Sequence, residues 1–403
     1  MRKILLGEPT GLSAPKLLTL GLQHAFTMFG ATILVPLLTG ISVSVALLMA
    51  GLSTIAFHII TKGKVPIFLG SSFAFIAPVI LVSELYGMPY ALGGIVVSGA
   101  VYFLFAILIK ILGPKRILSL FPPVVTGPVI SIIGLMLAYV AIKQATDNWM
   151  LAAVSFVAVA VISIYGKGFL KLVPIICGII IGYIVALATG NVDFSAFSGT
   201  AVFGVPDFTL AKFSLPAIAI VVPVAVATVA EHIGDMIAVE EITGEDVIAD
   251  PGLHRTLLGD GLASMISAMF GGPANTTYSE NMGVLALTKV THPIVMRIAA
   301  VFAIILGFSP MVAAAISTIP LGVIGGISII LFGMIAAVGF RIMVENKVDF
   351  KDSRNLIIVA TIMVFGLGGA MFEIFEIQLG GVGLAAIIGV ILNKAIPAPK
   401  EKK

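Results

Sequence analysis

The sequence predicts an all-α polytopic membrane protein with fourteen transmembrane segments in two inverted seven-span repeats, and with short extended segments in spans three and ten. Three observations predict this fold class: the hydropathy of the chain, the distribution of its basic residues and a weak internal repeat. Of 403 residues, 59% are hydrophobic and only 11% are charged, and the mean hydropathy is +1.16. Soluble domains carry about 25% charged residues, so much of this protein must face lipid.

Apolar stretches between turn residues and charges define the predicted spans. A helix of roughly 20 apolar residues crosses ~30 Å of hydrocarbon. In the first half the predicted spans are 16–39, 43–60, 66–83, 90–110, 118–141, 149–165 and 172–190. In the second half they are 214–238, 252–270, 274–289, 293–317, 320–341, 355–372 and 378–395.

Lysine and arginine are distributed unevenly between the two sides that these spans define. With both termini in the cytoplasm, 21 of the 23 basic residues fall on the cytoplasmic side, and only Lys143 and Lys212 fall outside. Cytoplasmic loops of membrane proteins carry such an excess of positive charge. The bias therefore predicts an even number of spans and two cytoplasmic termini.

The two halves of the chain resemble each other weakly. Pro123 precedes the tetrapeptide ISII at 130–133, and Pro320 precedes the same tetrapeptide at 327–330, with a constant offset of 197 residues. Because each half has an odd number of spans, the second half must cross the membrane in the opposite sense. Inverted repeats are typical of secondary transporters, whose sites lie near the bilayer midplane at broken helices.

The third and tenth spans are the candidates for such breaks. Residues 70–78 (GSSFAFIAP) and 272–281 (GPANTTYSEN) are rich in turn-forming and β-favouring residues. We expect a short extended segment leading into a half-helix in each. Extended backbone at membrane depth is tolerated only where it faces protein or a cavity. Free amides near Phe73 and Ser279 would then be available to the carbonyl oxygens of a ligand.

Carboxyl groups are the most informative side chains inside the predicted spans. Glu231 follows sixteen uncharged residues, Asp235 comes one turn later, and Glu280 lies at the break of the tenth span. A charge at the bilayer centre costs at least ~2.5–3.5 kcal/mol on insertion scales, so such groups are rare unless they are functional. Packing against a neighbouring helix, or capping of the break by Glu280, remains the structural alternative.

The carboxyl groups and the free backbone amides together restrict the chemistry of the substrate. Carboxylates accept hydrogen bonds from N–H donors, whereas backbone amides donate to carbonyls. A flat, uncharged ring that alternates N–H and C=O groups satisfies both sets, and an anion would be repelled by ionised Glu231 and Glu280. A carboxyl group in this setting is expected to bind and release a coupling proton. His24, in the middle of the first span, either orients a carboxyl group or packs between helices.

Other function classes find little support. No cluster has zinc-ligand spacing and no phosphate-binding loop is present. A membrane-embedded enzyme would need a nucleophile–base pair or a metal cluster. An anion exchanger or channel of the same inverted architecture would not be expected to carry acids at positions 231 and 280. We therefore expect no enzymatic activity and no cofactor, with H+ as the coupling ion.

Four segments resemble those of a known family, the nucleobase–cation symporters, also called nucleobase–ascorbate transporters. They are 23–32 (QHAFTMFGAT), 69–75 (LGSSFAF), 250–255 (DPGLHR) and 280–289 (ENMGVLALTK). The last matches the family signature [Gln/Glu/Pro]-Asn-x-Gly-x-x-x-x-Thr-[Arg/Lys/Gly], and it is the most specific of the four. The resemblance extends over nearly the whole chain.

The resemblance implies proton symport of a nucleobase by an elevator-like movement in a bacterial cytoplasmic membrane, often as a homodimer through a gate domain. Residues 1–112 and 213–318 would form a core domain, and 113–212 and 319–403 the gate domain. Glu231 and Glu280 would grip the ring N–H groups, while the backbones of Phe73 and Ser279 would meet the ring carbonyls. Tyr278 and Ala31 would line the pocket, and the proton-coupling residues would be Glu231, Asp235, Glu280 and His24.

Two positions bear on which base is carried. Glu280 at the first signature position fits the uracil-carrying branch better than the Gln that is usual in xanthine and urate carriers. Asp235, however, stands where that branch has a histidine, and the Glu-x-x-x-Asp spacing resembles the purine-carrying branch. Ser279 replaces a glycine of the uracil branch. The resemblance thus implies uracil, with a purine base such as xanthine as the alternative.

Overall fold

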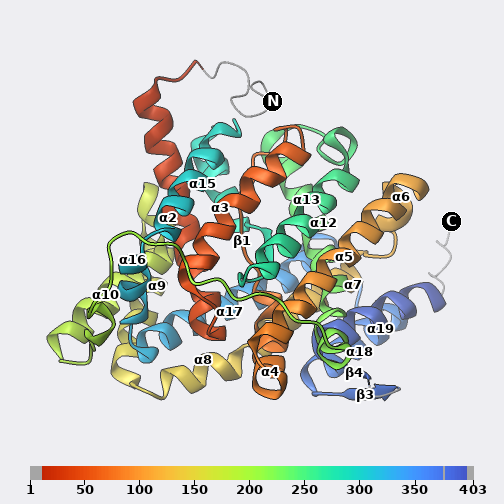
Figure 1. Ribbon diagram of the computed structural model, residues 1–403. Coiled ribbons are helices and arrows are strands. Elements are labelled where there is room, and N and C mark those ends of the chain that lie inside the picture. Colours follow the sequence, from red (N-terminus) through yellow and green to blue (C-terminus); the bar gives the residue numbers. More distant parts are fainter. Residues whose placement is uncertain (1–10, 375–376, 397–403) are drawn as a thin grey trace.

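The computed structural model describes residues 11–374 and 377–396, most of them in helices (Figure 1). In the first half of the chain the helices are α2 (Ala14–Thr39), α3 (Val43–Ile60), α4 (Ile76–Tyr86), α5 (Met88–Leu112), α6 (Pro114–Leu118), α7 (Pro123–Met136), α8 (Ala138–Ala145), α9 (Trp149–Tyr165) and α10 (Pro174–Ala188). In the second half they are α11 (Leu215–Val221), α12 (Val224–Thr243), α13 (Leu253–Met269), α14 (Ser279–Thr288), α15 (Ile294–Gly307), α16 (Pro310–Ser317), α17 (Leu321–Glu345), α18 (Ser353–Leu367) and α19 (Gly381–Ala395). Single helical turns are η1 (Phe73–Phe75), η2 (Gly168–Leu172), η3 (Ser195–Phe197) and the π-type η4 (Ile248–Gly252). The strands are β1 (Leu69–Ser71), β2 (Asn275–Thr277), β3 (Met371–Ile374) and β4 (Ile377–Gly380).

Many of these helices are apolar enough to cross a membrane. Within the described ranges, six helical stretches are also long enough, and the bent pair α15 and α16 would make a seventh span. Another five apolar helices have 10–17 residues each. The chain is therefore a mostly helical polytopic membrane protein, as predicted, whereas the count of fourteen spans stays a prediction.

The predicted span 293–317 is not one continuous helix. α15 ends at Gly307 and α16 begins at Pro310, and the two helices turn by 84° at the junction. The physical reason is local: a proline disfavours helical geometry in the residue before it. Ser309 is accordingly extended, with φ −114° and ψ 95°.

The helices pack in two groups, each held together by a close contact between glycines. In the first group α13 packs against α5 and α3, and α15 against α3 and α2; in the second, α17 packs against α7, α8 and α9. A Cβ atom on Gly99 of α5 or Gly261 of α13 would lie 2.7 or 2.8 Å from the other residue's carbonyl oxygen. Gly127 of α7 and Gly339 of α17 form the same kind of contact, at 3.0 and 2.4 Å. Small residues allow helix backbones to approach this closely.

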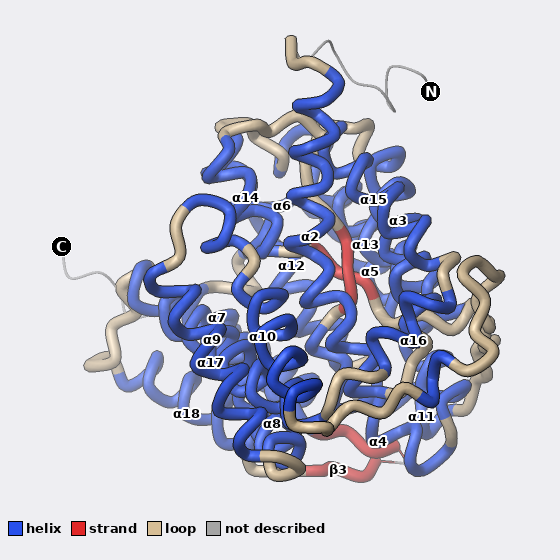
Figure 2. Tube along the Cα trace, turned by 90° about the vertical axis from the view of Figure 1, so that its left-hand side faces the viewer, coloured by secondary structure: helices blue, strands red, loops and turns tan. Residues whose placement is uncertain are grey.

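Two short strands meet in the interior, among the helices of the first group (Figure 2). β1 and β2 pair antiparallel, and all six of their residues are buried. The N–H of Ser72 donates to the carbonyl of Ala274 at 2.8 Å, and that of Tyr278 donates to Phe68 at 3.0 Å, which extends the ladder at both ends. β1 leads into η1 and α4, and β2 leads into α14. Both strands overlap the segments where extended backbone was expected, and the backbone N–H and C=O groups of one strand pair with those of the other.

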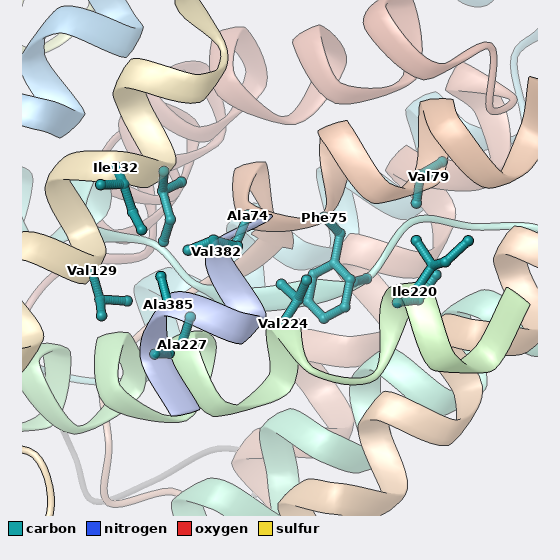
Figure 3. Packing of buried hydrophobic residues seen from close by; sticks show 14 of the residues in the cluster. Ala74, Phe75, Val79, Val129, Ile132, Ile220, Val224, Ala227, Val382 and Ala385 are labelled. Atoms are coloured by element: carbon teal, nitrogen blue, oxygen red, sulfur yellow. The ribbon is translucent and has the colours of Figure 1, made fainter. Parts of the chain in front are cut away.

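Apolar side chains join the two groups (Figure 3). Phe75 before α4 and Val224 of α12 belong to the same buried cluster as residues of α7 and α19. Gly383 of α19 lies so close to the α11–α12 break that a Cβ atom there would be 2.4 Å from Pro223. The contact between the groups is therefore rich in aliphatic surface.

A second pair of strands was not predicted. β3 pairs antiparallel with β4, and the helix that follows begins at Gly381 rather than at 378. The sequence alternates apolar and polar residues within 372–374 and again within 376–379, which is the period of a strand rather than of a helix. This pair adds a second extended region to the segments expected in spans three and ten, and it moves the start of the last helix from 378 to Gly381.

Candidate functional site

Four acidic side chains lie near one another beside the paired strands β1 and β2. α12 carries Glu231 and Asp235, α13 carries Asp260, and α14 carries Glu280. They lie close enough that the charges of the other three act on Glu231. Asp235 and Asp260 are buried, and the other two are partly buried. The three acids singled out from the sequence are thus neighbours in space, and Asp260 joins them.

The carboxyl groups of Glu231 and Glu280 are placed to accept hydrogen bonds. The Oε2 atom of Glu231 is buried, and none of the described residues donates to it. Glu280 lies in the first turn of α14, where the free amides and the helix dipole favour a negative charge. A buried acceptor that lacks a protein partner is available to an N–H donor of a ligand.

Asp235 is hydrogen-bonded to the strand β2. The hydroxyl of Thr277, the last residue of β2, donates a hydrogen bond to Oδ2 of Asp235. This contact ties α12 to β2 one turn away from Glu231. The position of the Glu231 carboxyl relative to the strand therefore depends on Asp235.

Each of the two paired strands is followed by a helix that begins at a predicted site residue. Phe73 is the first residue of η1, after the extended Ser72. Ser279 is the first residue of α14, after the extended Tyr278. The first N–H groups of a helix have no partner within that helix. Two sets of amides therefore begin at the ends of the paired strands, near the acids.

Tyr278 and Ala31 are more deeply buried than a pocket wall requires. Tyr278 is 2% exposed and Ala31 is 0% exposed, and both belong to one apolar cluster. The Tyr278 hydroxyl donates to the carbonyl of Ser71 at 3.1 Å. A Cβ atom on Gly70 would lie 2.3 Å from the tyrosine ring, so only glycine fits beneath it. Tyr278 thus fastens the two strands together, and its role as a pocket residue stays a prediction.

His24 contacts an amide side chain. Asn281 Nδ2 lies 3.1 Å from His24 Nδ1 and 3.1 Å from the His24 carbonyl oxygen. Both side chains are fully buried. Asn281 follows Glu280 in α14, so His24 contacts the residue next to an acid rather than a carboxyl group itself. Its Nε2 atom accepts or donates no hydrogen bond within the described part of the chain.

Sequence reasoning missed two buried polar contacts. Asp260 faces His232, and Arg297 of α15 donates from Nε to His58 Nδ1 at 3.0 Å. His58 is 0% exposed, and its Nε2 lies 2.9 Å from the carbonyl oxygen of Ile67. A carboxylate inside the predicted span 252–270 was the signal that could have revealed Asp260.

The acids beside the strands do not form a cluster of metal ligands. Among the described residues, no group of three or more His, Cys, Asp and Glu could hold a metal ion. A cleft of about 540 Å³ lies instead at the far end of α12, between Thr243, Asp246, Asp250 and His292. The acids beside the strands are therefore the candidate site on chemical grounds.

Comparison with known proteins defines the class. Residues 15–374 match the model of the permease family, and the chain belongs to that family. It is a membrane transporter and not an enzyme, as predicted.

The relatives have more specific names. The chain is 46% identical to uracil permease of Bacillus caldolyticus over 94% of its length and 92% of the relative's. It is 40% identical to uracil permease of Escherichia coli (strain K12) over 93% of its length and 90% of the relative's. It is also 41% identical to the putative pyrimidine permease RutG of that organism, over 93% and 88%. The predicted family resemblance is confirmed.

Solved structures of more distant proteins have the same fold. The transmembrane domain of the cyanobacterial bicarbonate transporter BicA aligns with a TM-score of 0.65 at 13% identity, over 94% of this chain and 96% of that one. Murine Slc26a9, an anion transporter in the inward-facing state, aligns with a TM-score of 0.71 at 9% identity, over 98% and 70%. At such identities the likeness concerns the fold alone.

Proposed function

We propose that this protein takes up uracil together with a proton across a bacterial cytoplasmic membrane. The observation that carries the proposal is the placement of Glu231 and Glu280 beside the helix starts at Phe73 and Ser279. Curated relatives named uracil permease, 40–46% identical over more than nine tenths of the chain, support it.

Uracil matches this placement chemically. Its uncharged ring alternates N–H donors with C=O acceptors, and carboxylates and backbone amides supply the complementary groups. Glu231 and Glu280 bind the ring N–H groups, and the amides of Phe73 and Ser279 bind the ring carbonyls. The full set of proposed substrate-binding residues is Glu231, Glu280, Phe73, Ser279, Tyr278 and Ala31.

The proposed movement is an elevator-like exchange between two domains. Residues 1–112 and 213–318 form the core domain, and 113–212 and 319–403 form the gate domain, with fourteen spans in two inverted halves. Two observations support this division. The helix groups follow it, since α13 packs on α5 within one set and α17 on α7 within the other. The strands of the third and tenth spans pair with each other, as equivalent elements of inverted halves would.

The coupling ion is H+ and no cofactor takes part. The proposed proton-coupling residues are Glu231, Asp235, Glu280 and His24. Neighbouring acids titrate together rather than singly, so the coupling proton belongs to the group of acids. Both termini lie in the cytoplasm, and the protein forms a homodimer through its gate domain.

A purine base of the xanthine type is the second candidate substrate. Asp235 favours it, because this residue reproduces the Glu-x-x-x-Asp spacing of the purine-carrying branch. Glu280 and the relatives favour uracil.

The test is uptake of labelled uracil into cells that lack their own carriers, with xanthine, guanine and thymine as competitors. We expect saturable uptake that a protonophore abolishes and that excess unlabelled uracil suppresses more strongly than xanthine. Suppression by xanthine alone would transfer the assignment to purines. Uptake that is unchanged in Glu280→Ala would refute the site.

A further inference from the structure

The strand β1 has one edge that faces away from β2. In an antiparallel pair, the backbone groups of alternate residues face the partner strand, and those of the residues between them face the other way. The carbonyl of Phe68 and the N–H of Ser72 both bond to residues that flank β2. The backbone groups of Leu69, the residue after Phe68, therefore point away from β2. Leu69 is 0% exposed, so another part of the protein has to satisfy its N–H.

A threonine of α3 takes the place of a third strand at this edge. The N–H of Leu69 donates to Oγ1 of Thr54 at 2.9 Å, and the same oxygen lies 3.3 Å from the carbonyl oxygen of Leu69. The Thr54 hydroxyl donates to the carbonyl of Ala50 at 2.8 Å, within α3, and the side chain is 0% exposed. The position of β1 is therefore set by α3 as well as by β2.

A histidine one turn further along α3 holds the chain just before β1. Nε2 of His58 lies 2.9 Å from the carbonyl oxygen of Ile67, and Nδ1 accepts a hydrogen bond from Nε of Arg297 at 3.0 Å. A guanidinium only donates and a carbonyl only accepts, so the ring accepts from Arg297 and donates to Ile67. Thr54 and His58 are four residues apart and share one face of α3. This face thus holds the chain at positions 67 and 69.

The residue before Thr54 holds the other strand. Nδ2 of Asn275, the first residue of β2, donates to Oγ of Ser53 at 2.7 Å. The Ser53 hydroxyl donates in turn to the carbonyl of Ala263 on α13 at 3.4 Å. α3 itself packs against α13 and α15. A single helix of the first group is therefore bonded through its side chains to both strands.

The segment that α3 holds leads directly to the proposed substrate site. Phe73 is four residues beyond Leu69, and only the rest of β1 and the extended Ser72 lie between them. We propose that Thr54 and His58 are positioning residues of the substrate site. They act through β1, which they hold so that the amide of Phe73 stands opposite a ring carbonyl of the substrate. This inference rests on the proposed function and adds to it a helix that supplies no contact with the substrate.

The test compares threonine variants of α3 in cells that lack their own carriers. Uptake of labelled uracil is measured over a range of concentrations for the wild type, Thr54→Val, Thr54→Ser and Thr61→Val, per amount of folded transporter. Valine removes the acceptor of the Leu69 N–H at nearly constant volume, whereas serine keeps it. Thr61, at the end of α3, is the matched control. It is equally buried, and its hydroxyl bonds to the carbonyl of Phe57 in the same helix.

We expect Thr54→Val to raise KM by roughly 10-fold, the scale of one buried hydrogen bond. The maximum rate per folded transporter should change little, because a lost binding contact weakens binding without slowing the occupied carrier. Thr54→Ser and Thr61→Val should keep the wild-type KM. A purely structural role would reduce the amount of folded Thr54→Val and leave its KM unchanged. That result, or an equal rise of KM in Thr61→Val, would overturn the proposal.

Two variants of His58 make the same comparison should Thr54→Val fail to fold. Glutamine carries an N–H donor to the place of Nε2, toward Ile67. Asparagine is shorter and supplies only an acceptor near the place of Nδ1, toward Arg297. We expect a KM near that of the wild type in His58→Gln and a raised KM in His58→Asn. Equal KM values in the two variants would overturn the proposal.

Amide hydrogen exchange of the purified full-length protein needs no substrate. Peptides that contain Leu69 should exchange faster in Thr54→Val than in Thr61→Val, because the Leu69 N–H has lost its acceptor. Equal exchange in the two would overturn the proposal. Faster exchange together with no uracil uptake by the wild type would contradict the proposed function and support the link from α3 to β1, and xanthine then replaces uracil in the KM comparison. Saturable uracil uptake with one KM in every variant would contradict the positioning role alone.

Discussion

The hydroxyl of Thr277 donates a hydrogen bond to the carboxylate of Asp235, and this contact joins β2 to α12 in the interior of the protein. Asp235 lies one turn from Glu231, so the bond sets how the acid of the proposed site stands against the paired strands. We therefore expect this bond to matter more for substrate binding than the size of the side chain at position 277.

Thr277→Val removes the donor at nearly constant volume, whereas Thr277→Ser keeps it. A hydrogen bond to a charged group contributes about 1.5–3 kcal/mol, so we expect the valine variant to lose roughly 10- to 100-fold in uracil affinity. The serine variant should remain within a few-fold of the wild type. Binding to purified protein measures both. Equal losses in the two variants would indicate a packing role instead.

Glu231→Gln tests the proposed acceptor directly. The glutamine keeps the shape and one carbonyl acceptor but loses the charge, so the bond from a ring N–H of uracil becomes weaker. We expect a decrease in affinity of roughly 10-fold or more, with little change in Tm. Glu345→Gln, on the exposed end of α17, is the matched control and should bind as the wild type does. Wild-type affinity in Glu231→Gln would remove this residue from the site.

The contact between α5 and α13 predicts a steric effect. A methyl group at Gly99 would lie 2.4 Å from Met265 Cγ and 2.7 Å from the Gly261 carbonyl oxygen. Gly99→Ala should therefore lower stability by about 1–3 kcal/mol through overpacking. Gly333→Ala in α17 is the control, because no atom lies within 4 Å of a Cβ built there. It should be neutral or slightly stabilising. Unfolding curves in detergent compare the two, and an equal Tm for both would contradict the packing.

An ion pair in the loops predicts a small, pH-dependent effect. The hydrogen bond from Lys64 holds the pKa of Asp250 below its usual range. A lowered pKa in the folded state contributes stability above the unfolded value of about 3.9, and this contribution is lost as the pH falls through the folded value. Asp250→Asn should thus lower Tm slightly at neutral pH and have no effect in strong acid. Because both side chains are exposed, high salt should reduce the difference.

Much of the site could be predicted because its signals are local in the sequence. Glu231 and Glu280 stand out among apolar neighbours, and the turn-forming segments around Phe73 and Ser279 mark the breaks. The strand pairing was not stated in advance, since only the fold places β1 against β2. The contact of His24 with Asn281 spans 257 residues, and that of His232 with Asp260 joins two helices.

Other differences between the predicted and the observed elements arise where a local rule outweighs the average hydropathy of a segment. The stretch 293–317 is apolar apart from Arg297, Ser309 and Ser317, so its average hydropathy concealed the break that Pro310 imposes. The predicted span 378–395 included most of β4, the partner strand of β3, because β4 directly precedes an apolar helix. Asp260 was not singled out, although it lies inside the predicted span 252–270.

The most direct test of the central claim is uracil accumulation by the purified protein in proteoliposomes with an imposed pH gradient. Wild-type protein should concentrate labelled uracil when the side from which it is taken up is acidic, and should only equilibrate it when the gradient is collapsed. Glu231→Gln and Glu280→Gln should not concentrate it. Concentration of uracil without a proton gradient, or by both glutamine variants at the wild-type rate, would contradict the account.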